Sequence, residues 1–301
     1  MTSGPTLRFA KQNIQVSGSL LMGVVNASVN SFSDAGQYRT LNDRVDLADR
    51  LIAEGADIID VGGQSLVSGE PETPAEDEIA LVVPIVSSIA DRHPEVLISV
   101  DTYKPQVAEA AVEAGAAIVN DVSGLLYPDL ARVCAASGSA LVISHTRNKP
   151  KERLVEAIAY DDVVADVLLF LSEKMDQATN LGVPMDALIL DPGPDFAKTP
   201  AQTIEVIRRV EELRRFGRPL LLALSRKDFL GAIVEKTPRG RDAGTMAAIA
   251  MVAATPGNIF RVHDVAACRD VLKVVDVLSG RVDVPDDYRL PEELRREPSV
   301  S

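Results

Sequence analysis

The sequence predicts a single-domain α/β protein with the architecture of a (β/α)8 TIM barrel, and three observations lead to that prediction. Short aliphatic runs, each about as long as one strand, alternate eight times with longer amphipathic segments. Composition does not change between the two halves of the 301-residue chain, so nothing marks a second domain. Hydrophobic residues make up 46% and aromatic residues only 4%, which is typical of buried parallel strands built from Val, Ile, Leu and Ala.

The expected strands follow one another along the chain at residues 20–25, 57–61, 96–100, 117–119, 140–144, 187–190, 219–224 and 258–262. The helical patterns between and after them cover residues 42–54, 74–91, 105–114, 128–137, 160–181, 200–215, 241–254 and 265–279. Proline in a first turn and glycine after a last turn mark several of these boundaries. An open doubly wound sheet is the alternative, but no Gly-x-Gly-x-x-Gly motif follows the first strand.

Three regions follow from this pattern. Residues 1–18 precede the first strand and are expected to cap the floor of the barrel, which residues 19–280 would form. Residues 281–301 are charged and contain proline, so we expect a flexible tail. Cys134 and Cys268 fall within helical patterns and are expected to be packing residues, whereas His93 is expected to face solvent.

The charge balance excludes several functions. Lys and Arg number 31 and Asp and Glu number 44, which gives a net charge of −13. Nucleic acids and anionic membranes require a basic face, so neither is expected as a partner. The N-terminus has no apolar leader segment and no stretch is apolar enough to span a membrane, so we expect a cytoplasmic protein.

Polar residues end all eight expected strands, and in this architecture such residues point into the mouth of the active site. A single Asp or His at such a position is more often a helix cap or a packed residue, and we expect this for His145 at the end of the fifth strand. The informative observation is that polar residues occur at all eight strand ends. Strands one, seven and eight contribute a predicted phosphate or pyrophosphate site made of Asn26, Ser225, Arg261 and His263. The ends of strands three, four and six carry Asp101, Asn120 and Asp191, and strand seven adds Lys227. These groups match a heterocycle rich in N–H donors and carbonyls, such as a pterin or a purine.

The segments that contain these strand ends resemble, in order and over nearly the whole chain, the motifs of the dihydropteroate synthase family. Their sequences are MGVVNASVNSFSDAG, DIIDVGGQS, ISVDTYKP, VNDVSG, LDPGPDFAKT, LSRKDFLG and RVHDV. The resemblance implies a (β/α)8 barrel that joins 6-hydroxymethyl-7,8-dihydropterin pyrophosphate to p-aminobenzoate and releases pyrophosphate. It implies that the pterin is held by Asp101, Asn120, Asp191 and Lys227. It implies further that Asn26, Arg261 and His263 hold the pyrophosphate, with Mg2+ near Asn26, and that the protein is a homodimer, for which residues 243–254 are a candidate face.

Two loops depart from the family pattern. Ser-Val-Asn at residues 28–30 replaces the usual Thr-Pro-Asp, and Gln-Ser-Leu-Val-Ser at residues 64–68 replaces Glu-Ser-Thr-Arg-Pro. Val67 in place of Arg removes a cation that could meet the benzoate or the leaving pyrophosphate, and one such donor contributes about 10²–10³ in rate. Asp195 stands where the family has Gly, and Ser-His-Thr at residues 144–146 replaces Met-His-Met.

The favoured hypothesis is a homologue that keeps the pterin and pyrophosphate pocket but has little or no synthase activity. The alternatives are an active synthase with a rearranged pocket for the second substrate and a non-catalytic pterin-binding protein. A corrinoid-linked methyltransferase is less consistent with the sequence, because the segments SRK and RVHDV favour a ligand that carries pyrophosphate.

Overall fold

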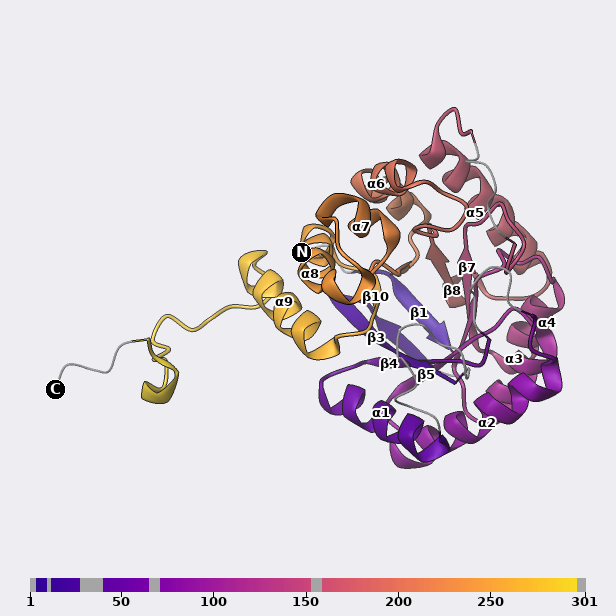
Figure 1. Ribbon diagram of the computed structural model, residues 1–301, viewed down its shortest axis with the longest axis horizontal. Helices are drawn as coiled ribbons and strands as arrows, with labels where there is room; N and C mark the ends of the chain where they lie inside the picture. The colour runs from indigo at the N-terminus through magenta and orange to yellow at the C-terminus, as the bar shows by residue number, and fades with distance from the viewer. Residues whose placement is uncertain (1–3, 10–11, 28–39, 65–70, 153–158, 297–301) are drawn as a thin grey trace.

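The computed structural model describes residues 4–9, 12–27, 40–64, 71–152 and 159–296. Its centre is a closed barrel of parallel strands in the order β10-β3-β4-β5-β6-β7-β8-β9, which confirms the predicted fold (Figure 1). The strands are β3 (Ser19–Asn26), β4 (Ile58–Gly62), β5 (Leu97–Asp101), β6 (Ile118–Asp121), β7 (Ala140–Ser144), β8 (Leu188–Asp191), β9 (Leu220–Leu222) and β10 (Asn258–Val262). Because all strands run in parallel, their C-terminal ends meet at one rim of the barrel.

Helices surround the barrel and cover its outer face (Figure 1). They are α1 (Leu41–Ala53), α2 (Ala75–Arg92), α3 (Pro105–Glu113), α4 (Asp129–Ser137), α5 (Val163–Asn180), α6 (Pro200–Arg208), α7 (Asp228–Val234), α8 (Asp242–Ala253) and α9 (Val265–Leu278). Short 3-10 helices lie at η1 (Met185–Ala187), η2 (Val210–Phe216), η3 (Pro238–Gly240) and η4 (Glu292–Leu294). Successive strand residues alternate between the interior and this helical layer, as Ile58 and Ile59 of β4 do.

Two stretches differ from the predicted helices. The pattern over residues 200–215 divides into α6 and η2, and Val210 and Leu213 of η2 are both buried. The short helix α7 was not predicted, because Gly231 interrupts its apolar pattern. A Cβ at that position would lie 2.4 Å from the Arg241 guanidinium, so the close approach of this arginine requires glycine.

An antiparallel hairpin of β1 (Thr6–Phe9) and β2 (Gln12–Gln15) precedes the barrel. Its side chains Leu7 and Phe9 are buried against residues from the first half of several strands, among them Met22, Ile58 and Ile118. The hairpin therefore fills the N-terminal end of the barrel interior. Together with the aliphatic layers of the strands, it makes that end a packed core, so only the opposite rim is available for chemistry.

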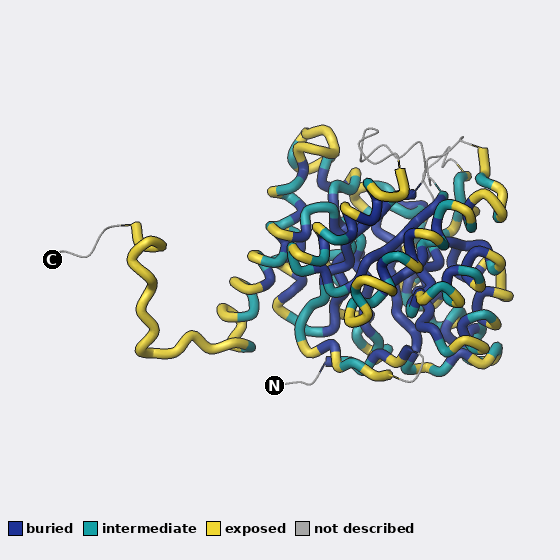
Figure 2. The backbone as a smooth tube through the Cα atoms, turned by 90° about the horizontal axis from the view of Figure 1, so that it is seen from below, coloured by how far each residue is buried: buried dark blue, intermediate teal, exposed yellow. Residues whose placement is uncertain are grey.

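The C-terminal segment extends away from the barrel after α9, and its described residues from 282 to 296 are exposed (Figure 2). Cys134 and Cys268 are buried, which confirms their packing role. His93 corrects the sequence prediction, because it is half-buried and its Nε2 lies 2.8 Å from Asp49 Oδ1, so it joins α2 to α1. Among the described residues, no helix has the length and apolar character needed to cross a membrane.

Candidate active site

An ion-paired cluster crosses the mouth of the barrel. Arg261 on β10 places Nε 2.7 Å from Asp60 Oδ2 on β4 and Nη2 2.8 Å from Asp101 Oδ2 on β5. Asp60 is fully buried, so the guanidinium supplies most of the compensation for its charge. Asp60 was not among the predicted site residues, although a carboxylate inside the aliphatic run 57–61 was a signal that could have identified it.

Two oxygen atoms beside this cluster have no hydrogen-bond partner within the described part of the chain. Asn120 on β6 donates from Nδ2 to Asp60 Oδ2 over 3.2 Å, but Asn120 Oδ1 and Asp60 Oδ1 are both buried and unpaired. A buried acceptor without a donor costs free energy. These two atoms are therefore suited to receive N–H groups from a bound molecule.

Asp101 can change protonation state near neutral pH. Its burial raises the pKa of the carboxyl to about 7, an effect that Arg261 opposes and that Asp60 reinforces. A carboxyl group that is half protonated at neutral pH can donate or accept a hydrogen bond. Strongly shifted groups of this kind are concentrated at functional sites.

Asp191 occupies the end of β8 and is held in place by two donors. Its Oδ1 accepts a 2.7 Å hydrogen bond from the Gly193 amide, and its Oδ2 accepts a 2.9 Å hydrogen bond from Ser144 Oγ on β7. Burial raises the pKa of Asp191, whereas these hydrogen bonds and the nearby Lys227 oppose that rise. Ser144, which departs from the family pattern, thus orients a predicted site residue.

Lys227 precedes α7, and its Nζ lies 4.3 Å from the centre of the Phe196 ring. Burial lowers the pKa of Lys227, whereas Asp195 and Asp191 oppose that shift. Phe196, on the loop between β8 and α6, was not predicted as a site residue. The signal for it lay in the segment LDPGPDFAKT, but sequence alone does not show that its ring reaches the lysine.

The structure brings together only some of the predicted anion-binding residues: Ser225 contacts His263, whereas Arg261 contacts carboxylates. Ser225 Oγ lies 2.9 Å from His263 Nδ1, so strands β9 and β10 bring this pair together as expected. Burial, with the nearby charges of Arg226 and Arg261, lowers the pKa of His263 to about 4, so the imidazole is neutral at pH 7. Arg261, in contrast, is directed toward carboxylates. Asn26 ends β3 next to Gly62 of β4, at the same rim.

A pocket of about 380 Å³ lies beside Lys227 and Phe196. It contains side chains of both signs: its charged lining residues are Lys149, Lys151, Glu152, Asp195, Arg226, Lys227 and Asp228. Asp195 Oδ2 accepts a 2.5 Å hydrogen bond from the Asp228 amide, and Asp228 Oδ1 lies 2.8 Å from Arg241 Nη1. Arg226 is paired with Asp242 at 2.7 Å. The substitution at Asp195 therefore adds a carboxylate beside Lys227.

Gln64 has a role within the protein rather than in this pocket. Its Oε1 accepts hydrogen bonds from the Thr73 amide at 2.8 Å and from Lys104 Nζ at 3.1 Å. Lys104 also lies 2.7 Å from the buried Glu78. Gln64 therefore connects the end of β4 to the region before α2. The departures at residues 28–30 and 65–68 lie outside the described residues.

The chain is similar to known proteins over most of its length. The profile of the pterin-binding enzyme family matches residues 22–263. Dihydropteroate synthase from Escherichia coli (strain K12) is 36% identical over 264 residues, which cover 88% of this chain and 93% of that protein.

Solved structures agree with this relationship. The Yersinia pestis dihydropteroate synthase in complex with a sulfonamide drug superposes with a TM-score of 0.86 at 30% identity, covering 92% of this chain and 100% of that one. The Xanthomonas albilineans dihydropteroate synthase with 4-aminobenzoic acid gives a TM-score of 0.83 at 35% identity, covering 94% and 100%. The predicted family is confirmed: the chain belongs to the dihydropteroate synthase family of pterin-binding enzymes.

Proposed function

We propose that this protein binds a pterin, or a pterin that carries pyrophosphate, in the mouth of the barrel and has little or no dihydropteroate synthase turnover. The observation that carries the binding proposal is that Asp101, Asn120 and Asp191 stand at the C-terminal ends of their strands, at one rim of the barrel, where Asn120 Oδ1 is buried and unpaired. The membership of the chain in a pterin-binding family supports the same ligand class.

The proposed pterin site follows from matched donors and acceptors. The pyrimidine ring of a pterin presents an amino group and a ring N–H on one edge, and a carbonyl oxygen and ring nitrogens elsewhere. Asp191 and the unpaired Asn120 Oδ1 would accept from the first edge, and Lys227 would donate to the carbonyl or a ring nitrogen. The Phe196 ring beside Lys227 would supply an apolar surface for the flat ligand.

The proposed pyrophosphate site lies on the side of β10. Arg261 supplies a planar guanidinium that suits phosphate oxygens, and Ser225 and His263 supply neutral polar atoms nearby. A pyrophosphate group would compete with Asp60 and Asp101 for Arg261. Stabilisation of the departing anion is the electrostatic contribution that this group of residues would make to a synthase reaction.

A magnesium ion fits this site as an ion that binds together with pyrophosphate. Mg2+ is commonly held by one or two protein oxygens plus the phosphates of a substrate. Asn26 offers a side-chain amide oxygen at the correct rim, and the described residues contain no group of three or more His, Cys, Asp or Glu that could hold a metal by themselves. When bound, the ion would reduce the negative charge on the pyrophosphate.

Low turnover is supported by the second-substrate region. Leu66 and Val67 replace Thr and Arg of the family pattern, and Asn30 replaces Asp. Asp195 adds a carboxylate to the pocket beside Lys227, where it would repel the carboxylate of p-aminobenzoate. A non-catalytic pterin-binding protein is the limiting case of this proposal.

One observation favours the second candidate, an active synthase with a rearranged pocket. Lys149 and Lys151 line the same pocket as Lys227, on the loop after β7. Their ammonium groups could take over the interaction with a benzoate carboxylate that the missing arginine would otherwise make. The two candidates share the pterin site and differ only in whether the second substrate is bound productively.

A homodimer is proposed through the face that carries α8. Met251 on α8 is 85% exposed, and Ile233 on α7 and Val274 on α9 are each 58% exposed. Large apolar side chains grouped on neighbouring helices are typical of an interaction surface. The expected face at residues 243–254 includes Met251.

Calorimetry with 6-hydroxymethylpterin pyrophosphate in the presence of Mg2+ tests the binding proposal. We expect saturable binding by the wild type and a loss of about tenfold or more in affinity for Asp191→Ala, which removes a charged acceptor. Asp129→Ala removes a carboxylate that is 70% exposed and serves as the matched control. Absence of binding by the wild type, or unchanged affinity in Asp191→Ala, would contradict the proposal.

A further inference from the structure

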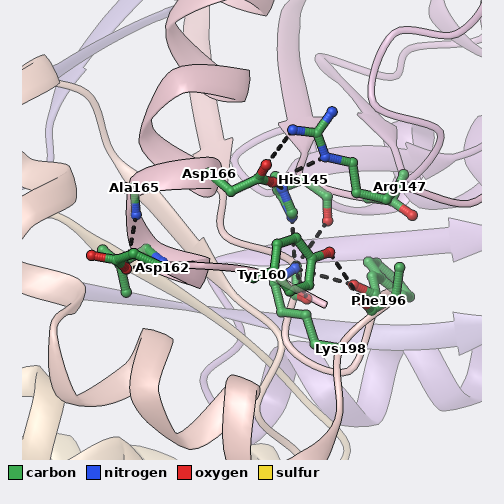
Figure 3. Close-up of polar contacts among 12 residues, drawn as sticks. His145, Arg147, Tyr160, Asp162, Ala165, Asp166, Phe196 and Lys198 are labelled. Atoms are coloured by element: carbon green, nitrogen blue, oxygen red, sulfur yellow. Dashed lines mark hydrogen bonds and ion pairs between the residues drawn. The ribbon is translucent and has the colours of Figure 1, made fainter. Parts of the chain in front are cut away.

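A single buried ammonium group contacts several parts of the loop between β8 and α6. Lys198 is only 5% exposed, and its Nζ lies 2.7 Å from His145 Nδ1, 2.9 Å from the Gly193 carbonyl and 3.1 Å from the Phe196 carbonyl. Figure 3 shows Lys198 beside His145 and Phe196. An ammonium group has three N–H donors, which suits these three shorter contacts, and the His145 carbonyl lies farther away at 3.4 Å.

The partners of His145 determine the direction of its hydrogen bonds. Its Nε2 lies 2.8 Å from Asp166 Oδ1 on α5. Burial opposes ionisation of Asp166, but hydrogen bonds from Arg147 and His145 keep the pKa of this carboxyl below its usual value. Asp166 is therefore an ionised acceptor, so His145 donates from Nε2 and accepts at Nδ1 from Lys198.

His145 is neutral in this arrangement. Its burial and the neighbouring Lys198 charge lower the pKa of the imidazole to about 3, against the effect of Asp166. Burial lowers the pKa of Lys198 to about 7, against the effect of Asp191 and Asp166, and this value still lies above that of the imidazole. In this pair the lysine therefore carries the proton, and His145 is the acceptor. The result is a directed chain of hydrogen bonds from Lys198 through His145 to Asp166 (Figure 3).

The loop has a backbone conformation that needs external support. Gly193, Asp195 and Ala197 have φ angles of 65°, 62° and 50°, in the left-handed region that residues with a side chain rarely adopt. The loop also approaches β7 closely, since a Cβ on Gly193 would lie 2.0 Å from the His145 carbonyl. Within the loop, the Phe196 amide donates to the Gly193 carbonyl over 3.0 Å, and Lys198 donates to the carbonyls of both residues.

The position of this loop determines where the Phe196 ring lies. The ring is 4.3 Å from Lys227 Nζ, and both residues line the 380 Å³ pocket. This contact combines apolar packing with attraction between the ammonium group and the ring face. A shift of the Phe196 backbone would therefore change both the pocket wall and the position of Lys227.

We propose that Lys198 is a positioning residue, whose ammonium group, oriented by His145 and Asp166, holds the β8–α6 loop so that Phe196 lies against Lys227. Lys198 contacts neither edge of the proposed pterin site directly and acts through the loop. Its effect on ligand binding rests on the proposed function, whereas its effect on the loop does not.

Amide hydrogen exchange of the ligand-free protein tests the effect on the loop. Lys198→Met keeps the aliphatic stem and removes every donor, so we expect the Phe196 amide to exchange about tenfold faster or more. Lys174→Met is the matched control, because Lys174 is a partly buried lysine near a different phenylalanine. Its Nζ lies 5.6 Å from the Phe170 ring centre and 3.0 Å from Gln177 Oε1. Unchanged exchange at Phe196 in Lys198→Met would overturn the inference.

Asp166→Asn provides a second variant in case Lys198→Met does not fold. The amide keeps the shape of the side chain but removes the charge that fixes the His145 tautomer. We expect faster exchange at Phe196 in this variant as well, with slow exchange retained in the barrel strands. If the Phe196 amide of Asp166→Asn exchanges as slowly as in the wild type, the proposed chain of hydrogen bonds from Lys198 through His145 to Asp166 is contradicted.

A double-mutant cycle with pterin pyrophosphate tests the effect on binding. We expect Lys198→Met and Phe196→Ala each to weaken binding about tenfold, and the double variant to bind no more weakly than either single variant, because both act through one contact. Fully additive losses would overturn the inference. A wild type that binds no pterin would contradict the proposed function instead, and the exchange experiment would still decide the role of Lys198.

Discussion

Asp60 Oδ2 and Arg261 Nε, from residues 201 positions apart in the sequence, lie 2.7 Å apart inside the barrel mouth, where Asp60 is fully buried. This ion pair places the only guanidinium among the predicted site residues between two carboxylates. It holds Arg261 at the rim where a pyrophosphate group is proposed to bind. A buried charge is strongly dependent on its partner, so the pair also connects the site to the stability of the fold.

Loss of Arg261 is expected to destabilise the protein. Arg261→Met leaves Asp60 buried without its cation, and removing one partner of such a pair costs about 3 kcal/mol or more in the free energy of unfolding. Arg269→Met is the matched control, because the pair of Arg269 and Asp57 is more exposed and contributes about 1 kcal/mol or less. Denaturant titration of the three proteins measures both values, and equal losses in the two variants would contradict the prediction.

Two histidines near the rim, the buried His145 and the partly buried His263, are expected to make the fold sensitive to acid. The pKa of His145 is lowered to about 3 and that of His263 to about 4, and burial is the largest cause of both shifts. A histidine in the unfolded chain has a pKa of about 6.5. At a pH between this value and the lower pKa of the folded protein, the unfolded chain therefore binds more protons than the folded chain. The histidine contribution to stability is therefore complete above pH 6.5 and is lost as the pH falls toward 4.

Comparison of the wild type with His263→Asn between pH 7 and pH 4 measures this contribution. Asp101 acts in the opposite direction, because burial raises its pKa to about 7 and its stabilising effect is lost as pH rises from about 4 toward 7. Both proteins contain Asp101, so its contribution cancels when the free energies of unfolding of the two proteins are subtracted at each pH. We expect a shallower loss of stability in His263→Asn, and parallel curves would count against the assigned cause.

The carboxylate of Asp195 is expected to weaken binding of an acidic second substrate. Asp195→Gly removes that carboxylate while accommodating the φ of 62°, so repulsion of p-aminobenzoate should fall. We expect the affinity for p-aminobenzoate, measured with pterin pyrophosphate present, to rise about fivefold. Glu152→Gln removes another carboxylate of the same pocket and distinguishes a local effect from a change in total charge.

Restoration of the two altered loops is expected to raise turnover. A combined variant restores the charges and the donor that the family pattern contains; it carries Asn30→Asp, Gln64→Glu, Leu66→Thr, Val67→Arg and Ser68→Pro. We expect dihydropteroate formation to increase by about 10²-fold, the contribution of one catalytic donor. If the rate does not rise, the cause of low turnover lies elsewhere, with Asp195 as the next position to change.

The apolar face around α8 is expected to be covered by a second copy of the chain. Met251→Asp places a charge on the side chain with 85% exposure and should convert a dimer into monomers at micromolar concentration. Leu169→Asp on α5, where the side chain is 59% exposed, is the matched control and should leave the assembly unchanged. Sedimentation velocity decides between these outcomes, and a monomeric wild type would contradict the proposed dimer.

Sequence reasoning identified the barrel because strand-length aliphatic runs and helical periodicity are local properties. The same reasoning placed Asp101, Asn120 and Asp191 at one rim, since parallel strands bring their C-terminal ends together. The division of the predicted helix 200–215 is not identifiable from the sequence, because apolar residues three positions apart, such as Val210 and Leu213, suit both an α-helix and a 3-10 helix. Local pattern is therefore informative about elements and less so about their ends.

The contacts within the site were harder to predict than its residues. Arg261 was assigned to an anion site, but only the closed barrel shows that Asp60 and Asp101 lie within reach of it. The role of Lys198 is not predictable from the sequence, because it depends on a contact with His145, which follows β7. Gln64 illustrates the same point, since its partner Lys104 is determined by the fold rather than by neighbouring residues.

The central proposal, a retained pterin site with little synthase turnover, is tested most directly by the rate of dihydropteroate formation. The assay combines the purified wild type with pterin pyrophosphate, p-aminobenzoate and Mg2+, and runs the Escherichia coli enzyme in parallel. We predict a rate about 10²-fold or more below that of the parallel enzyme, under conditions where calorimetry shows the pterin to be bound. A comparable rate in the two proteins would contradict the proposal and establish the chain as an active synthase.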